Sequence, residues 1–283
     1  MKWQGRRGSR NIEDRRGQRR GARAAGGVGG LGLIAILVIG YFLGVDVTPL
    51  LDGAMTGGQG GAVEITKADE ERAGFVSVTL ADTEEVWADI FDRQVDGDYV
   101  PAVLVLYKGV TQSPCGGASG ATGPFYCPGD QKVYLDTDFF VTMQRQLGAG
   151  GDFAAAYVVA HEIAHHVQDE LGILGQANRI RAQSSPERAN EISVRIELQA
   201  DCYSGIWARE AAAKFGSVER GDIAEAMNAA KQIGDDTLQR IAGRVPQPHT
   251  FTHGTSAQRQ RWFATGYESG DLAACDTFSA RRL

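Results

Sequence analysis

The feature that most constrains the fold of this chain is a run of 22 residues, 24–45, that contains no charged side chain. Its densest apolar part lies at residues 31–43. A helix of that length rises about 33 Å, and the hydrocarbon core of a bilayer is about 30 Å thick. The run therefore predicts one N-terminal transmembrane helix.

Charged residues are distributed unevenly around this run. Residues 1–23 hold nine Lys and Arg residues against two acidic ones, whereas the rest of the chain holds 20 basic and 33 acidic residues, a net charge of −13. Basic residues before an apolar span favour retention of that end in the cytoplasm. We therefore expect a basic cytoplasmic arm at residues 1–23, a single membrane crossing, and a body outside the cytoplasm.

Two other interpretations of the N-terminal region are open. A cleaved signal peptide fits less well, because the basic region is long and no small-x-small cleavage site follows the apolar run. A basic arm can also bind nucleic acid. Its position next to an apolar span favours membrane topology instead, so the membrane is an expected partner and nucleic acid is not.

The rest of the chain divides into a linker and one domain. Residues 46–67 contain GAMTGGQGGA, which predicts a flexible linker, and residues 68–283 follow as the domain. Helices are expected at residues 69–94, 138–147, 153–171, 186–215, 223–233, 236–242 and 256–267, and short strands at 99–107 and 131–135. Pro101 indicates an edge position or a late start for the first strand. The expected fold class is α+β, mostly helical with a small β-sheet.

Four cysteines follow the apolar run: Cys115, Cys127, Cys202 and Cys275. An even number outside the cytoplasm predicts two disulfides. Cys115 and Cys127 flank a Gly/Pro/Ser-rich stretch that a disulfide would hold together, which would leave Cys202 to pair with Cys275. Four cysteines allow three pairings, and the sequence does not select among them. No C-x-x-C spacing occurs, so a zinc site made of cysteines is not expected.

His161 and His165 lie four residues apart in the helix expected at 153–171. This spacing places both imidazoles on one face, where they can bind one Zn²⁺ ion. Glu162 is one position round the helix, close enough to accept a proton from a zinc-bound water. His166 points about 100° away and is not an expected ligand. Because H-E-x-x-H also occurs by chance, an amphipathic helix with surface histidines is the alternative.

A catalytic zinc site needs a third protein ligand and an open position. Glu197 and Asp201 lie four residues apart on the second long helix. Small residues surround them and would let this helix approach the metal-binding helix closely: Ala200, Ser204 and Gly205. Apolar neighbours indicate a largely buried helix, whose carboxylates need partners. We expect Glu197 to be the third ligand and Asp201 to accept the other ring proton of His161. Solvated acids on an exposed face are the alternative.

Three segments together, HEIAHHVQ, IELQADCYSGIWA and FTHGTSAQRQRWFATGY, resemble the bacterial putative neutral zinc metallopeptidase family. The N-terminal MKWQGRRGSRNIEDRRG, the apolar run and FYCPGDQKVYLD resemble it as well, so the similarity covers nearly the whole chain. More distantly, the chain resembles the gluzincins that include the CAAX-prenyl endopeptidases, which pair HExxH with a downstream ExxxD. The resemblance implies a zincin-like domain with one Zn²⁺ ion. Together with the apolar run and the basic residues before it, we expect a single-pass protein of the bacterial inner membrane with a periplasmic catalytic domain.

Those endopeptidases also carry a C-terminal T-H-P…R element. Here it reads T-H-G, with His253 in the middle and Arg259 six residues later, and Gly254 stands in place of the proline. The resemblance implies that His253, Arg259 or both face the scissile carbonyl of a substrate.

Together these patterns predict a membrane-anchored zinc-dependent endopeptidase with a polypeptide substrate of unknown sequence. A metal-activated water would attack a peptide carbonyl, with Glu162 as general base. Two alternatives are open: a tethered binding or scaffold protein with a vestigial zinc site, and a hydrolase of another amide such as cell-wall peptide. Residues 133–135 are a candidate edge strand for a bound peptide, and a structural strand is the alternative.

Overall fold

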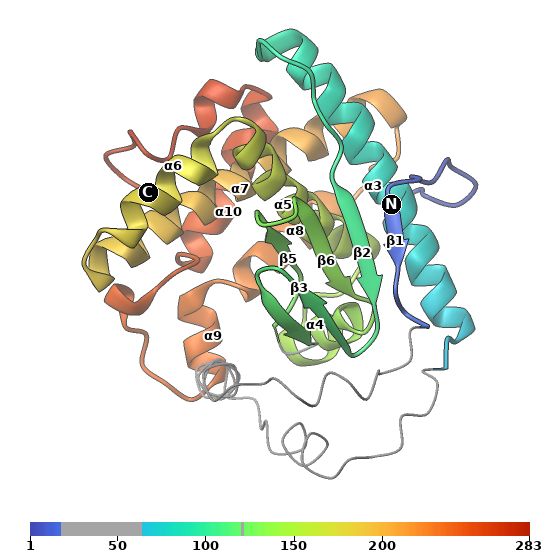
Figure 1. Cartoon of the computed structure of the whole chain (residues 1–283), viewed down its shortest axis with the longest axis horizontal. Coiled ribbons are helices and arrows are strands. Elements are labelled where there is room, and N and C mark those ends of the chain that lie inside the picture. The colour runs from blue at the N-terminus through green and yellow to red at the C-terminus, as the bar shows by residue number, and fades with distance from the viewer. Residues whose placement is uncertain (18–63, 120–121) are drawn as a thin grey trace.

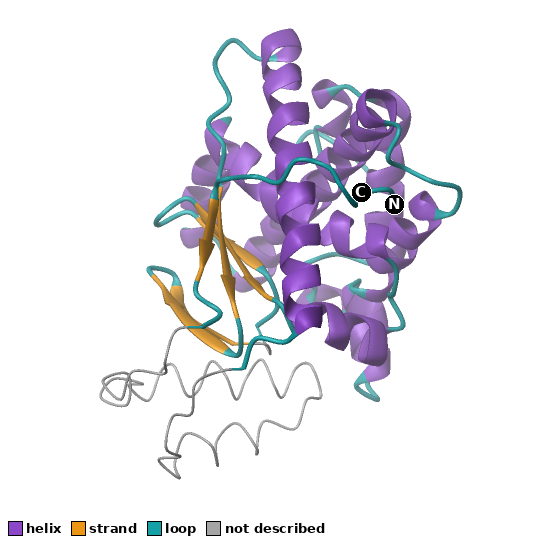
Figure 2. Cartoon of the chain, turned by 90° about the vertical axis from the view of Figure 1, so that its right-hand side faces the viewer, coloured by secondary structure: helices purple, strands orange, loops and turns teal. Residues whose placement is uncertain are grey.

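The structure is a computed structural model that describes residues 1–17, 64–119 and 122–283. Helices form most of this part of the chain, and the strands gather on one side of them (Figures 1 and 2). The helices are α3 (Lys67–Gln94), α4 (Phe139–Leu147), α5 (Asp152–Glu170), α6 (Ile173–Ala182), α7 (Pro186–Phe215), α8 (Asp222–Gln232), α9 (Asp235–Ile241) and α10 (Ser256–Ser269), with 3-10 turns η2 (Pro248–Thr250) and η3 (Leu272–Cys275). The strands are β1 (Ile12–Asp14), β2 (Val103–Tyr107), β3 (Val110–Ser113), β4 (Gly116–Ser119), β5 (Phe125–Cys127) and β6 (Lys132–Asp136). The α+β prediction is confirmed.

The main sheet has four strands in the order β1-β2-β6-β5. β2 runs parallel to both β1 and β6, whereas β5 is antiparallel to β6. Val133 of β6 lies opposite Leu104 on one side and Tyr126 on the other, and residues 132–134 of β6 are paired with both neighbouring strands. The expectation of an edge strand at 133–135 is therefore wrong, because the sheet edges are β1 and β5. Pro101 precedes β2, as a late strand start requires.

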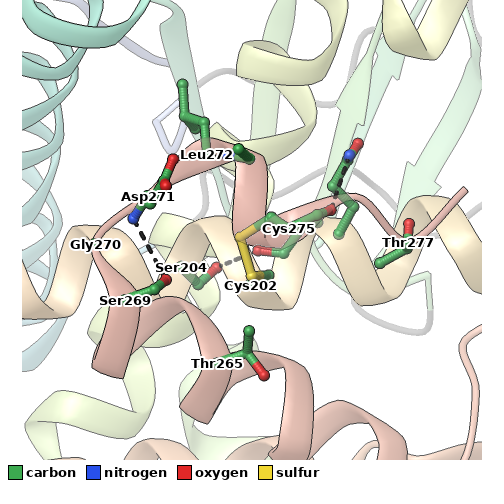
Figure 3. Close-up of a disulfide and its surroundings, with 12 residues drawn as sticks. Cys202, Ser204, Thr265, Ser269, Gly270, Asp271, Leu272, Cys275 and Thr277 are labelled. Carbon is green, nitrogen blue, oxygen red and sulfur yellow. Dashed lines mark hydrogen bonds between the residues drawn. A yellow bond between two sulfur atoms is a disulfide. The ribbon is translucent and has the colours of Figure 1, made fainter. Parts of the chain in front are cut away.

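The structure selects one of the three possible pairings, Cys115–Cys127 and Cys202–Cys275. Cys115–Cys127 ties the β3–β4 hairpin to β5, with 5.8 Å between the Cα atoms. Cys202–Cys275 joins α7 to η3 near the end of the chain (Figure 3). All four cysteines are paired.

The N-terminal residues are part of the folded domain. β1 forms one edge of the main sheet, beside β2 and close to α3 (Figure 1), and the Trp3 ring packs edge-on against Phe75 of α3 at 5.6 Å. The sequence predicts residues 1–23 to be an arm separate from a domain at 68–283, but the structure places residues 1–17 within that domain. The predicted membrane span at 24–45 lies outside the described residues, as does most of the predicted linker. Among the described helices, none combines the length and the apolarity needed to span a bilayer.

Helix α5 is buried around nearly its whole circumference and forms the centre of the domain. Phe153 at its start stacks on Trp207 of α7, with ring centroids 5.7 Å apart. The helix begins one residue earlier than expected: Gly151 (φ 111°) is the N-cap, and Asp152 is the first helical residue. Glu225 of α8 accepts a hydrogen bond from the Phe153 N–H at 3.1 Å. A Cβ at position 151 would overlap that carboxylate, so this loop requires glycine.

Helix α7 begins and ends where the sequence indicates. The Ser185 hydroxyl caps its first turn, and Gly216 (φ 58°) ends it in the left-handed conformation. Gly205 of α7 faces α10, where a Cβ would overlap the Phe263 carbonyl oxygen, and Gly266 of α10 faces Cys202 in the same way. The sequence predicts that small residues bring α7 close to the metal-binding helix, but Gly205 brings it close to α10. Helix α6 lies in a region where the sequence pattern predicts no helix.

Candidate metal centre

Three side chains from two helices converge at the middle of the domain. His161 and His165 come from α5 and Glu197 comes from α7. His161 Nε2 lies 3.1 Å from one Glu197 carboxylate oxygen, and His165 Nε2 lies 3.6 Å from the other. One ligand atom from each of the three residues can be chosen so that all lie within 4.8 Å of one another. The predicted meeting of the two helices at these three residues is present.

The arrangement fits a zinc ion. Ligand atoms at about 2.0–2.1 Å from a tetrahedral zinc lie about 3.3 Å apart, close to the separations found here. Two imidazole nitrogens and one carboxylate are also the donor set of a class of catalytic zinc sites. His161, His165 and Glu197 would therefore hold the ion.

Both histidines present Nε2 to this centre because their Nδ1 atoms face other partners. His161 Nδ1 lies 3.0 Å from Asp201 Oδ1, as a close ionic contact rather than a well-aligned hydrogen bond. His165 Nδ1 lies 2.9 Å from Gln168 Oε1. The Gln168 amide in turn donates to the Ile196 carbonyl of α7 at 2.8 Å. Such partners select the tautomer that leaves Nε2 free for a metal.

Asp201 is fully buried and is shared between three helices. Arg259 of α10 donates to both of its oxygens, from Nε and Nη2, each at 2.9 Å. The Tyr157 hydroxyl of α5 donates to Oδ1 at 2.5 Å. Burial opposes ionisation of Asp201, but Arg259 and His161 outweigh it and hold its pKa below the ordinary value. Asp201 is thus a buried anion positioned against His161, as predicted.

Arg259 does not face the metal centre as the resemblance implies. Its side chain is 2% exposed, and two of its guanidinium nitrogens are bound to Asp201. A buried guanidinium in a bidentate pair is held in place by that pair. Arg259 therefore supports the carboxylate behind His161 and is not available to a substrate carbonyl.

His253 is held at the edge of the centre by Asp235. Asp235 Oδ1 lies 3.1 Å from His253 Nδ1, while Oδ2 accepts the backbone N–H groups of Thr252, His253 and Gly254 at 2.8, 2.6 and 3.0 Å. The His253 side chain is half exposed. The charges of His253 and Glu197 influence each other's pKa.

Gly254 has a backbone conformation that proline cannot adopt. Its φ is +91°, whereas a proline ring holds φ near −65°. A Cβ there would also press on Leu198 and Val194 of α7 at 3.2–3.3 Å. With glycine in place of the proline of the T-H-P element, the chain thus adopts a different local turn. The hydrogen bonds to Asp235 hold this turn in place.

Glu162 is buried beside the two histidines, with 8% of its surface exposed. Burial raises its pKa, and the nearby charges of His165 and His161 partly offset that effect. The pKa of Glu197 is instead held well below the ordinary value, because His165 and His161 outweigh the effect of burial. The pKa values of the two glutamates are therefore shifted in opposite directions.

Three residues around this centre escape the sequence analysis: Tyr157, Gln168 and Asp235. Gln168 lies three positions after His165 on the same helix, so helical spacing alone could have indicated it. Tyr157 lies four positions before His161 and carries the same kind of signal. Asp235 has no local signal, because it lies 18 residues before His253 on a different element.

His166 is packed in the core, with Nε2 2.7 Å from the Val100 carbonyl oxygen, as expected of a histidine that is not a ligand.

The fold and the centre define a protein with an HExxH–ExxxD metal site. The family model for the putative neutral zinc metallopeptidases matches residues 1–278, and the chain belongs to that family. The uncharacterized protein YpfJ of Escherichia coli is 44% identical over 287 residues, which cover 98% of this chain and 99% of that protein. Uncharacterized proteins of Mycobacterium tuberculosis and Mycobacterium bovis are each 45% identical over 195 residues, 65% of this chain and 65% of theirs. No solved structure matches the chain.

Proposed function

We propose that this protein is a zinc-dependent endopeptidase with one Zn²⁺ ion held by His161, His165 and Glu197. The observation that carries the proposal is the convergence of these three ligands beside a buried glutamate of raised pKa. Zinc bound there would supply a Lewis acid that polarises a carbonyl and makes a neighbouring water more acidic. The remaining chemistry belongs to side chains of this chain.

Glu162 is the proposed general base. Its raised pKa brings it nearer to the pH at which a carboxylate accepts a proton most effectively. It takes a proton from the attacking water, and it then passes that proton to the amine that leaves when the peptide bond breaks. A carboxylate that both takes and returns the proton needs a protected position, which the burial of Glu162 provides.

His253 is the proposed donor to the negative oxygen that develops on the substrate carbonyl. Asp235 holds its Nδ1, so that Nε2 is the nitrogen available to substrate. Burial lowers the pKa of His253, but the hydrogen bond to Asp235 and the charge of Glu197 outweigh it and raise that pKa. A protonated ring is the form that can donate from Nε2 while its Nδ1–H remains on Asp235.

We further propose that the substrate is a polypeptide outside the cytoplasm and that residues 24–45 associate the protein with a membrane. The two disulfides support the compartment, because such bonds persist in oxidising surroundings. The uncharged run at 24–45 supports the association.

The Glu162→Gln variant of the full chain tests the proposal. We expect it to keep one zinc per chain, measured by elemental analysis, and to lose hydrolysis of a mixed peptide library by at least about a hundredfold. Glu197→Ala is the matched variant that should lose the metal itself. A Glu162→Gln protein that cleaves peptides like the wild type would refute the general base. A wild-type protein with full zinc and no hydrolysis of any amide would favour a binding protein with a vestigial site.

A further inference from the structure

The N-terminal segment, residues 1–17, is joined to the domain by backbone pairing. Ile12, Glu13 and Asp14 of β1 lie in register with Leu104, Val105 and Leu106 of β2. Hydrogen bonds from the Leu104 N–H to Asn11 and from the Arg15 N–H to Leu106, at 2.8 and 2.7 Å, extend the pairing to both ends of β1. Further along the segment, the Ser9 N–H donates to the Ser77 carbonyl of α3 at 2.9 Å.

Three of the six basic residues in this segment have ion-pair partners on α3. Arg6 donates to both oxygens of Asp82 at 2.6 Å. Arg7 pairs with Glu85 at 2.7 Å and Arg16 with Glu70 at 3.2 Å. These arginines are therefore used inside the molecule, as counter-charges for an acidic face of α3. These pairs account for part of the charge imbalance between the N-terminal segment and the body without involving the cytoplasmic face of a membrane.

The segment also leaves the domain at the place where the chain returns to it. Arg16, which is 5% exposed, donates from Nη1 to the Asp69 carbonyl in the first turn of α3 at 2.8 Å. Glu13 pairs with Lys132 of β6 at 2.8 Å. Residues on either side of the 18–63 segment thus touch each other at one corner of the domain. A single membrane crossing between them would put about 30 Å of hydrocarbon between groups that are in contact here.

We infer that residues 1–17 and the domain at 64–283 lie on the same side of the membrane, so the chain does not cross the bilayer once between them. This replaces the cytoplasmic N-terminus expected from the basic residues, because strand β1 and the arginine pairs cannot form across a bilayer. The disulfides place both parts outside the cytoplasm. The inference does not depend on zinc or on hydrolysis.

Thiol labelling of the full chain in E. coli spheroplasts tests the inference. Gln4→Cys and Gln183→Cys each introduce one thiol at an exposed position, one in the N-terminal segment and one at the end of α6, and the native cysteines are all paired. We expect a membrane-impermeant maleimide to label both variants in intact spheroplasts to the same extent as after lysis. Labelling of Gln183→Cys alone would overturn the inference. Protection of both until lysis would uphold the shared side and overturn the extracytoplasmic assignment.

Carbodiimide coupling in isolated membranes provides a second test. The reagent condenses the Glu13 carboxylate with the Lys132 amine into an amide, and the water that is lost hydrates the carbodiimide to a urea. Mass spectrometry of the digested full chain should find this link alongside one between Lys214 and Asp89, an ion pair within the domain at 2.6 Å. Lys132→Gln should abolish only the first link. Recovery of the Lys214–Asp89 link without the Glu13–Lys132 link from the wild type would show that β1 is not docked in the membrane-bound protein, and would refute the inference.

Discussion

Arg259 donates one hydrogen bond to Oδ2 of Asp201 and another to Oδ1, the same oxygen that lies 3.0 Å from Nδ1 of His161. A residue of the last helix is thereby linked through one buried anion to the first ligand of the metal centre. Removal of Arg259 would leave Asp201 as an unpaired buried charge, and Asp201 would then take up a proton or draw in water. The position of His161 depends on the anionic form.

We expect Arg259→Met to lower zinc affinity by about 10–100-fold and to destabilise the fold by roughly 3–5 kcal/mol. Chelator competition and chemical denaturation measure the two effects. Arg261→Met, at an exposed position on the same helix, should change neither by a comparable amount. Unchanged zinc affinity together with a loss of turnover would return Arg259 to the substrate-facing role that the structure denies it.

Gln168 selects the tautomer of His165 through the contact at Nδ1. We expect Gln168→Leu to weaken zinc binding by about 10–100-fold, because the ring loses the partner that orients it. Gln176→Leu on α6 is a matched exposed control. Equal zinc affinity in Gln168→Leu and in the wild type would show that packing alone orients His165.

Asp235→Asn should separate metal binding from turnover. The amide oxygen can still accept the three backbone N–H groups, but the amide nitrogen cannot accept the Nδ1 proton of a protonated His253. We expect unchanged zinc content and a fall in kcat of about a hundredfold, the typical effect of losing one donor to the developing oxyanion. Wild-type activity should also decline as the pH rises through the raised pKa of His253, and this limit should move to lower pH in Asp235→Asn. A pH profile that is identical in both proteins would contradict the assigned role.

Zinc affinity should depend on pH through His161. Burial lowers its pKa, but Asp201 and Glu197 outweigh that effect and raise it to about 9. The proton on His161 therefore contributes its full stabilisation of the metal-free fold at a pH below 6.5, the ordinary pKa of histidine. This contribution is lost as the pH rises through about 9. Zinc must displace the same proton, so its affinity should increase by about tenfold per pH unit between those values. A flat dependence in that interval, measured by competition with a chelator of known protonation, would contradict the raised pKa.

The crossing of α7 and α10 predicts an effect on stability. An alanine usually stabilises a helix relative to glycine by about 0.5–1 kcal/mol. At Gly266 the added Cβ would overlap the Cys202 carbonyl, so we expect Gly266→Ala to destabilise the fold by about 1–3 kcal/mol. Gly175→Ala on α6 should be neutral or stabilising, because its Cβ would meet only Arg179 at 3.7 Å. Equal effects of the two substitutions on the denaturation midpoint would refute the close approach.

The ligands could be predicted from the sequence because they depend on local geometry. Four-residue spacing on a helix puts His161 with His165 on one face, and Glu197 with Asp201 on another, before any tertiary structure is considered. The role of Arg259 was inferred wrongly because a motif reports which residue is near a site but not which side it occupies. Asp235 could not be found at all, since its contact with His253 exists only after α9 packs beside the loop that precedes α10.

The N-terminal segment shows a different limit. β1 is only three residues long and lies among arginines, so neither alternation nor apolarity marks it as a strand. The basic residues of the N-terminal segment look like the positive charges that precede a membrane span. The acidic face of α3 with which some of them pair is recognisable only in three dimensions. Composition thus indicates that the two regions differ in charge, and the structure pairs Arg6, Arg7 and Arg16 of the segment with carboxylates of α3.

The dependence of the metal centre on Arg259 has a consequence for the newly made protein. The ribosome delivers α5 and α7, with all three ligands, well before it delivers α10. Until that last helix docks, Asp201 lacks its counter-charge, and His161 has no fixed anion behind it. A nascent or truncated chain would thus carry every proposed zinc ligand and still hold the ion weakly until folding is nearly complete.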